Sequence, residues 1–251
     1  MKTLPVEFTG TTGDTIVGAL DLPDGSATAI GIFAHCFTCS KDLRVVREIG
    51  KAVTDEGLGL LRFDFAGLGQ SDGDFAETSF TTNTGDLRVA ADFLAREHAP
   101  PRFLVGHSLG GAAVLATGGD IESVRCVATI GAPSDQGHVR HLIEQAAFDE
   151  RGRARVNIGG RPFEIGRQFV EDLESHDLLS RVATLRKPLM VFHGPMDTIV
   201  GIEHAEKIFV AAKHPKSFVS LGNADHLVSA QEDARFLGHV LSAWAQRYVG
   251  D

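Results

Sequence analysis

The sequence predicts an α/β fold, a mostly parallel and twisted sheet with helices on both faces. Short, nearly continuous apolar runs recur along the chain, and longer amphipathic stretches separate most of them. Strands that are buried on both faces read as continuous apolar runs, and the helices that cover them supply the amphipathic stretches. Hydrophobic residues make up 43% and charged residues 23% of the 251 residues, an ordinary balance for one large globular domain.

The first two elements are expected to form a hairpin at one edge of the sheet. Residues 4–10 and 15–22 alternate polar and apolar side chains, and the turn-rich residues 11–14 separate them. Six apolar runs follow as candidate parallel strands, at 28–34, 57–65, 101–107, 124–132, 187–194 and 216–222. Helix-like segments lie between most of these runs, at about 43–56, 83–98, 108–118, 201–212 and 230–247.

One long interval, between the runs that end near residue 132 and begin near residue 187, interrupts this alternation. It is predicted to contain a helix at 138–149, a hairpin that turns at Gly159 and Gly160, and a helix at 165–181. No linker rich in proline, glycine or serine brackets the interval. We therefore expect a single domain, 1–251, with a cap inserted at about 135–185, rather than two domains.

Composition and charge exclude several classes of protein. Lys and Arg number 24 against 33 Asp and Glu, a net charge of −9, which argues against a nucleic acid as the main partner. The first residues lack the apolar core of a signal peptide, and no stretch approaches the ~18 apolar residues of a membrane span. Three cysteines are too few, and odd in number, for a secreted disulfide framework. These features predict a reduced, cytoplasmic protein.

A nucleophile motif follows the third of the parallel runs. Residues 106–110 read Gly-His-Ser-Leu-Gly, with a strand expected before them and a helix after them. In that context a sharp turn holds Ser108 in a strained backbone conformation, and Gly106 and Gly110 leave room for the neighbouring elements. The turn also places the hydroxyl at a helix N-terminus, which favours negative charge. Ser108 is therefore the candidate nucleophile.

A serine nucleophile needs a histidine base and an acid later in the chain. Asp197 and His226 each come just after a predicted strand, and the order Ser108, Asp197, His226 is the one that a strand–turn–helix nucleophile requires. Taken singly, Asp197 could cap a helix and His226 could be an ordinary surface histidine. Asp135 is the reserve candidate for the acid, while Asp225 is too close to His226 along the chain to orient its ring easily.

Acyl transfer at Ser108 creates an oxyanion that needs two hydrogen-bond donors. The backbone N–H of Leu109 is one candidate, because it follows the nucleophile. The loop after the run 28–34 should supply the other, because that strand is expected beside the nucleophile strand. The backbone N–H of Phe37 is the first choice in that loop, and that of Cys36 is the second.

Cys36 and Cys39 allow two other interpretations of the same loop. Their spacing is that of a redox dithiol or of half a zinc site. A redox role would explain neither Ser108 nor the candidate acid and base, but it stays open as an alternative. Zinc is disfavoured because the chain has no second Cys-x-x-Cys pair and Cys126 lies in a predicted buried strand. The oxyanion loop needs only backbone groups, so the two thiols are incidental to it.

Five stretches of the chain carry a resemblance to a known family: HCFTCSKD, LLRFDFAGLGQSDGDF, LVGHSLGGAA, VFHGPMDTIV and NADHLV. They resemble the α/β-hydrolase superfamily over essentially the whole length, and within it small carboxylesterases of the cinnamoyl or feruloyl esterase type. The oxyanion loop of those enzymes reads His-Gly-Phe-Thr-Gly. Here Cys36 and Cys39 stand at the two glycine positions, and the match implies the Phe37 N–H as an oxyanion donor. A closer likeness is to the hydrolase half of bacterial proteins that are fused to a C-terminal OsmC-like domain, so a fused or missing domain of that kind stays open.

Together these features predict a serine hydrolase that cleaves carboxylic esters through a Ser-His-Asp triad and an acyl-enzyme, with no cofactor and no bound metal. Candidates for substrate contact are three residues beside the expected triad and three phenylalanines of the cap, which suggest an apolar acyl pocket: His35, Cys36, His107, Phe148, Phe163 and Phe169. Asp64 ends a strand at the same edge of the sheet, where we expect a structural hydrogen-bonding role.

The expected partner is a small-molecule ester, with neither a nucleic acid nor a membrane involved, and a homodimer is left open. Three alternatives remain beside the esterase. The same triad could serve a thioesterase or an acyltransferase, Cys36 and Cys39 could make the chain a thiol-redox protein, or the chain could be a binding member of the fold without turnover.

Overall fold

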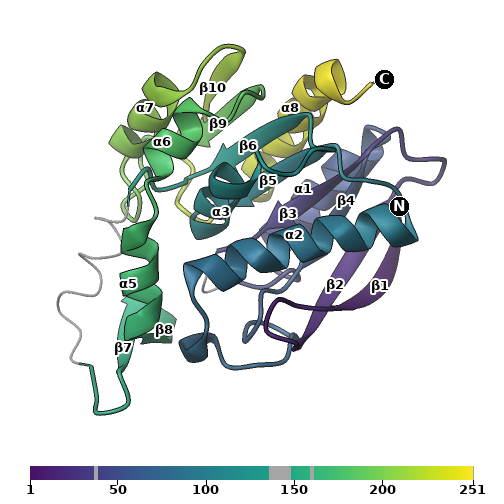
Figure 1. The fold of residues 1–251 in the computed structure, drawn as a ribbon. Helices are drawn as coiled ribbons and strands as arrows, with labels where there is room; N and C mark the ends of the chain where they lie inside the picture. Colours follow the sequence, from purple (N-terminus) through teal and green to yellow (C-terminus); the bar gives the residue numbers. More distant parts are fainter. Residues whose placement is uncertain (37–38, 136–147, 159–160, 251) are drawn as a thin grey trace.

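An eight-stranded sheet runs through the molecule in a computed structural model that describes residues 1–36, 39–135, 148–158 and 161–250 (Figure 1). In sheet order the strands are β1 (Lys2–Thr9), β2 (Thr15–Leu22), β4 (Gly59–Phe63), β3 (Ile30–Ala34), β5 (Phe103–His107), β6 (Cys126–Ile130), β9 (Leu189–His193) and β10 (Lys216–Ser220). The β1–β2 and β2–β4 pairs are antiparallel, and every pairing from β4 across to β10 is parallel.

Burial along the strands follows their position in the sheet. Every residue of β3, β4, β5, β6 and β9 is buried, as expected for central strands that are covered on both faces. The edge strands β1 and β10 are partly exposed instead. The predicted α/β fold with an edge hairpin is thus confirmed.

Helices cover both faces of this sheet. On one face α1 (Arg44–Asp55) packs against α8 (Gln231–Val249) over a core that includes Phe33, Leu60 and Phe192. On the other face lie α2 (Phe80–Glu97), α3 (Leu109–Thr117) and α7 (Ile202–Ala211), over the core that includes Leu61 and Leu104 (Figure 1). A short 3₁₀ helix, η1 (Phe75–Glu77), precedes α2. Among the described residues, no helix combines the length and the apolarity that a membrane crossing would need.

The segment between β6 and β9 holds a hairpin and two helices, drawn in green at the side of Figure 1. The antiparallel strands β7 (Arg153–Ile158) and β8 (Arg161–Gly166) form the expected hairpin, and α5 (Arg167–Ser175) and α6 (Leu178–Ala183) follow it. The predicted helix at 138–149 falls almost entirely outside the described residues, and residues 148 and 149 are not helical. The organisation as one domain with a cap stays a prediction.

The single helix predicted at 165–181 is wrong in detail. Residues 165 and 166 belong to β8, and the rest of the range is divided between α5 and α6, with residues 176 and 177 outside both helices. The second begins because the Asp177 side chain accepts a hydrogen bond from the Ser180 N–H at 3.1 Å, as an N-cap does. Apolar periodicity continues through this break, which is why the sequence pattern read it as one helix.

Candidate active site

Ser108 lies on the turn between β5 and α3, at the carboxyl edge of the parallel strands. Its φ of 54° and ψ of −121° are a conformation that residues with a β-carbon rarely adopt. A β-carbon built on Gly110 would lie 2.1 Å from the Ala34 carbonyl oxygen, and one on Gly106 would lie 2.2 Å from the Gly110 oxygen. Only hydrogen fits at either position, so the two glycines allow the turn to close tightly against the end of β3.

The ends of β9 and β10 bring two further side chains to Ser108. The His226 Nε2 atom lies 3.0 Å from the Ser108 Oγ atom, and the His226 Nδ1 atom lies 2.7 Å from the Asp197 Oδ2 atom. Because Asp197 accepts, Nδ1 carries a proton and Nε2 presents its lone pair to the hydroxyl in the neutral ring. The structure therefore brings together the three residues that the motif order singled out.

Asp197 is held as a carboxylate by donors on both oxygens. Its Oδ1 atom accepts from the N–H groups of Ile199 and Val200, each at 2.9 Å. Burial alone would raise the pKa of Asp197, but the hydrogen bond and charge of His226 and these two backbone N–H groups outweigh it and lower the pKa. The side chain thus makes the turn contacts expected of a capping residue and also orients His226.

Comparison with known proteins shows the family to which the chain belongs. Residues 32–147 match a family model described as serine aminopeptidase, S33. The crystal structure of the esterase domain of a Rhodothermus marinus protein is 51% identical, covers 100% of both chains and superposes with a TM-score of 0.85. The chain belongs to the α/β-hydrolase family. The esterase Est1E of Butyrivibrio proteoclasticus, solved with bound ferulic acid, shares the fold with a TM-score of 0.81 at 16% identity, over 97% of this chain and 99% of that one.

One relative of the chain is named as a thioesterase. The mitochondrial palmitoyl-protein thioesterase ABHD10 of mouse is 29% identical over 191 residues. That match covers 72% of this α/β hydrolase and 63% of the mouse protein, so the chain spans less than two thirds of that relative.

The reserve acid, Asp135, and the acid set aside from the sequence, Asp225, both have other partners. Asp135 accepts from the Ser134 hydroxyl at 2.9 Å and from Lys207 Nζ at 3.0 Å. Asp225 accepts from the Ser229 N–H at 2.7 Å. It is therefore Asp197, the first choice from the sequence, that lies at hydrogen-bond distance from His226.

Asp64 anchors both ends of the loop that follows β3. Its carboxylate accepts from the Lys41 N–H at 2.6 Å and from Lys41 Nζ at 3.0 Å, after the loop, and lies 3.2 Å from the His35 Nε2 atom, before it. The Gln70 N–H donates to it at 3.0 Å. Burial would raise the pKa of Asp64, but His35 and the backbone donors lower it to about 2. This is the structural hydrogen-bonding role expected of Asp64.

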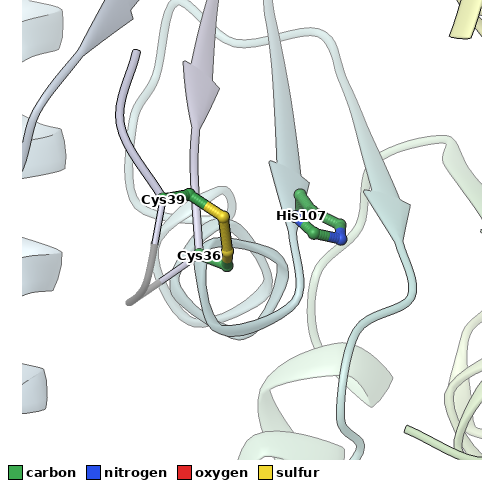
Figure 2. Close-up of side chains that lie close together, drawn as sticks. All are labelled: Cys36, Cys39 and His107. Carbon is green, nitrogen blue, oxygen red and sulfur yellow. A yellow bond between two sulfur atoms is a disulfide. The ribbon is translucent and has the colours of Figure 1, made fainter. Parts of the chain in front are cut away.

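The two cysteines of this loop are bonded to each other. Cys36 and Cys39 form a disulfide with their Cα atoms 5.3 Å apart (Figure 2). The expectation that all cysteines are reduced is therefore wrong for this pair. A Cys-x-x-Cys turn brings two sulfurs together without any help from a secreted disulfide framework, so the low cysteine count did not exclude it. Cys126 is the buried free thiol, as its place in a strand predicted.

The donors predicted for the oxyanion differ in how far the structure describes them. Leu109 is the first residue of α3, at the helix N-terminus beside Ser108. Phe37 lies outside the described residues, so its role as a donor stays a prediction. Cys36, the second choice, is only 5% exposed and its carbonyl oxygen lies 2.7 Å from the His35 Nδ1 atom.

Two of the predicted substrate-contact residues are histidines with partners in the protein. His35 is 1% exposed and faces Asp64. The His107 Nε2 atom lies 2.7 Å from the His226 carbonyl oxygen, so the imidazole supports the backbone that carries the candidate base. Burial, followed by the charge of His226, lowers the pKa of His107 to about 3. Sequence reasoning missed this contact, although the position of His107 directly before Ser108 was a signal for it.

The three phenylalanines of the predicted acyl pocket lie in the segment between β6 and β9 and pack against the hydrophobic core. Phe169 is fully buried, with its ring 5.4 Å from that of Phe75, and Phe163 lies 4.9 Å from the same ring. The guanidinium of Arg167 lies 4.5 Å from the Phe148 ring centre. A small pocket lies elsewhere, between α3 and the helices α2, α5 and α6; its lining is Phe80, Leu109, Ala112, Pro133, Asp135, Leu173, His176 and Leu178.

Proposed function

We propose that this α/β hydrolase cleaves carboxylic esters with Ser108 as nucleophile, His226 as general base and Asp197 as the residue that orients the imidazole. Ser108 Oγ attacks the ester carbonyl while its proton moves to His226 Nε2. The same proton then passes to the alkoxide as the bond between the acyl carbon and the alcohol oxygen breaks. Water repeats the sequence on the acyl-enzyme and releases the acid.

One observation carries this proposal. Two hydrogen bonds, of 3.0 Å and 2.7 Å, connect a serine on a strained turn to a histidine and then to a carboxylate. A histidine paired with a carboxylate is common in proteins and does not by itself indicate catalysis. Here the pair faces a serine with a strained, positive-φ backbone at a strand–helix junction, an arrangement that folding alone does not require and that is typical of a nucleophile. We propose the backbone N–H groups of Leu109 and Phe37 as the two donors to the oxyanion.

The pocket beside Leu109 is our candidate for the acyl site. Most of its lining is apolar, and Leu109 connects it directly to the nucleophile turn. A series of p-nitrophenyl esters of increasing acyl length should show a short-chain optimum of kcat/KM, since the pocket is small. A flat profile across the series would argue that the acyl group lies elsewhere.

Hydrolysis of p-nitrophenyl acetate by the wild type and by Ser108→Ala tests the reaction. We expect kcat to fall by about 10⁶-fold, because the triad acts as a unit. Wild type should also be labelled at Ser108 by a fluorophosphonate, as found by peptide mass mapping. An inactive and unlabelled wild type would favour a binding protein without turnover, and activity retained in Ser108→Ala would remove this serine from the mechanism.

Ser134→Ala is the matched control for that experiment. The Ser134 hydroxyl lies 2.9 Å from His204 Nδ1 and 2.9 Å from Asp135, which resembles a second serine–histidine–acid group. Ser134 is fully buried, however, so no ester can reach it. We expect Ser134→Ala to keep the wild-type rate and the fluorophosphonate label.

Thioester hydrolysis on the same triad is the second candidate, because the mouse relative is a palmitoyl-protein thioesterase. The acyl-enzyme is the same for both reactions, and only the leaving group differs. The kcat/KM values for an oxyester and a thioester of one short acyl group decide between the two. A larger value for the thioester would make this the better description of the enzyme.

A further inference from the structure

The cluster formed by Cys36, Cys39 and His107 is not explained by ester hydrolysis. One ligand atom from each of the three residues lies within 4.8 Å of the other two. All three residues are buried, with exposed fractions of 5%, 6% and 5%. Figure 2 shows the sulfur atoms and the imidazole at the same level, the cysteines on the loop after β3 and the histidine at the end of β5. The proposed reaction uses neither sulfur atom.

His107 has the protonation that a metal ligand needs. Its Nε2 atom lies 2.7 Å from the His226 carbonyl oxygen. A carbonyl only accepts, so this nitrogen carries the ring proton and the other nitrogen carries a lone pair. Metal-bound histidines typically donate their second nitrogen to a carbonyl or carboxylate in this way.

The cysteines are arranged as a ligand pair by the backbone around them. Cys-x-x-Cys is the usual spacing of two thiolates on one zinc ion, and the Cys39 N–H donates to the Cys36 carbonyl oxygen at 3.2 Å. The loop is anchored before Cys36 by His35 and after Cys39 by Lys41, through Asp64. We expect these anchors to keep the two cysteines beside His107 after the disulfide is reduced. In a tetrahedral zinc site with Zn–S of about 2.3 Å, the sulfurs are about 3.8 Å apart, so the disulfide must be reduced before zinc binds.

We propose that the reduced chain binds one Zn²⁺ ion through Cys36, Cys39 and the His107 imidazole, and that the metal-bound and disulfide forms of the loop exclude each other. A phosphine or dithiol reductant supplies two electrons, and two protons from solvent complete the two thiols as the S–S bond breaks. Binding of Zn²⁺ then releases both thiol protons. Three protein ligands leave one tetrahedral position for water. Thiolates select such a soft ion over Mg²⁺ or Ca²⁺.

The sequence disfavours a zinc site because it contains no second Cys-x-x-Cys pair to supply the remaining ligands. The third ligand comes from another strand. β3 and β5 are adjacent and parallel, with Ala34 in register with Gly106, so the loop after β3 begins beside His107, the last residue of β5. The pairing of β3 with β5 therefore supplies the third ligand, which the spacing of the cysteines could not indicate.

The test measures zinc itself and needs no ester. Wild type is reduced with a phosphine, freed of it under nitrogen and titrated with Zn²⁺, and Co²⁺ is used as a spectroscopic substitute. We expect one Zn²⁺ per chain, two protons released per ion in weak buffer, and a sulfur-to-cobalt charge-transfer band. The oxidised wild type should show none of these. Equal binding by the oxidised and reduced forms, or no binding by the reduced form, overturns the proposal without any variant.

Variants then assign the ligands. Cys36→Ser, Cys39→Ser and His107→Gln should each weaken Zn²⁺ binding by at least about 100-fold, beyond the effect typical of an outer partner of a metal ligand. Cys126→Ser is the matched control, because this thiol is buried in β6 and burial raises its pKa to about 12. It should bind zinc like wild type. Circular dichroism confirms that each variant is folded, and undiminished binding by a folded Cys36→Ser/Cys39→Ser chain would place the zinc elsewhere.

Discussion

Asp197 shows how one side chain serves two structural needs. Its Oδ1 atom closes the turn after β9 through Ile199 and Val200, while its Oδ2 atom faces His226. The turn contacts fix the carboxylate in place before any substrate arrives. A positioned acid of this kind selects the tautomer of the histidine and stabilises the imidazolium that forms during proton transfer.

Asp197→Asn should lower kcat by about 10⁴-fold. The amide can keep much of the turn geometry but cannot stabilise an imidazolium or hold the right tautomer. Steady-state hydrolysis of p-nitrophenyl acetate measures the effect. Asp225→Asn is the control, because this acid lies beside His226 in sequence but accepts from Ser229. Comparable losses in both variants would show that a general change of charge near His226 is responsible.

The contact between α3 and the end of β3 sets the shape of the site at the level of helices and strands. Gly110 approaches the carbonyl oxygens of Ala34 and His35 so closely that a β-carbon would lie 2.1 Å and 2.6 Å from them. Ala34 and His35 directly precede Cys36 in the loop after β3. Because Gly110 has no side chain, the nucleophile turn can pack directly against the start of the proposed oxyanion loop.

Gly110→Ala should push this loop away from the nucleophile. We expect kcat to fall by roughly 10²–10³-fold, the effect of losing one oxyanion donor, and stability to fall by about 1–3 kcal/mol from overpacking. Urea unfolding and ester kinetics measure the two effects. Gly119→Ala, just beyond the same helix, is the control, since its β-carbon would meet nothing closer than 3.6 Å. Wild-type kcat in a folded Gly110→Ala would mean that the close approach does not position the loop.

Buried charges connect several elements of the molecule beneath the site. Arg62 of β4 donates to both oxygens of Asp21 in β2, at 2.6 Å and 3.1 Å, and also to the Lys41 carbonyl oxygen. Lys41 in turn contacts Asp64. Charges of this kind are costly to bury, and removal of one partner leaves the other unpaired. The network therefore couples the loop after β3 to the stability of the whole fold.

The stability of the whole molecule should depend on the ionisation of Asp64. Its pKa falls from 3.8 to about 2 on folding, so the ionised form contributes about 2 kcal/mol above pH 4, which is lost as the pH falls through 2. Urea unfolding of wild type and Asp64→Asn should therefore show a large stability difference at pH 6 that shrinks toward pH 2. Asp24→Asn, whose side chain is 91% exposed, should match wild type throughout. A difference that does not vary with pH would contradict this role.

The succession of strands and helices along the chain could be predicted from the sequence because it depends on local patterns. Apolar runs marked the buried strands, and the spacing of glycines around Ser108 marked the turn at which the nucleophile motif lies. The motif order also selected Asp197 and His226, since parallel strands all end at the same edge. These inferences needed no knowledge of which strand lies beside which.

Contacts between segments that are distant in sequence required the fold. The support of His226 by His107, the anchoring of the loop by Asp64, and the position of His107 beside Cys36 and Cys39 all depend on strand order and register. The start of a second helix at Leu178 depended on the Asp177 cap, which apolar periodicity does not report. Periodicity records which face of a segment is buried, whereas the partner that a polar side chain meets is set by how the sheet is assembled.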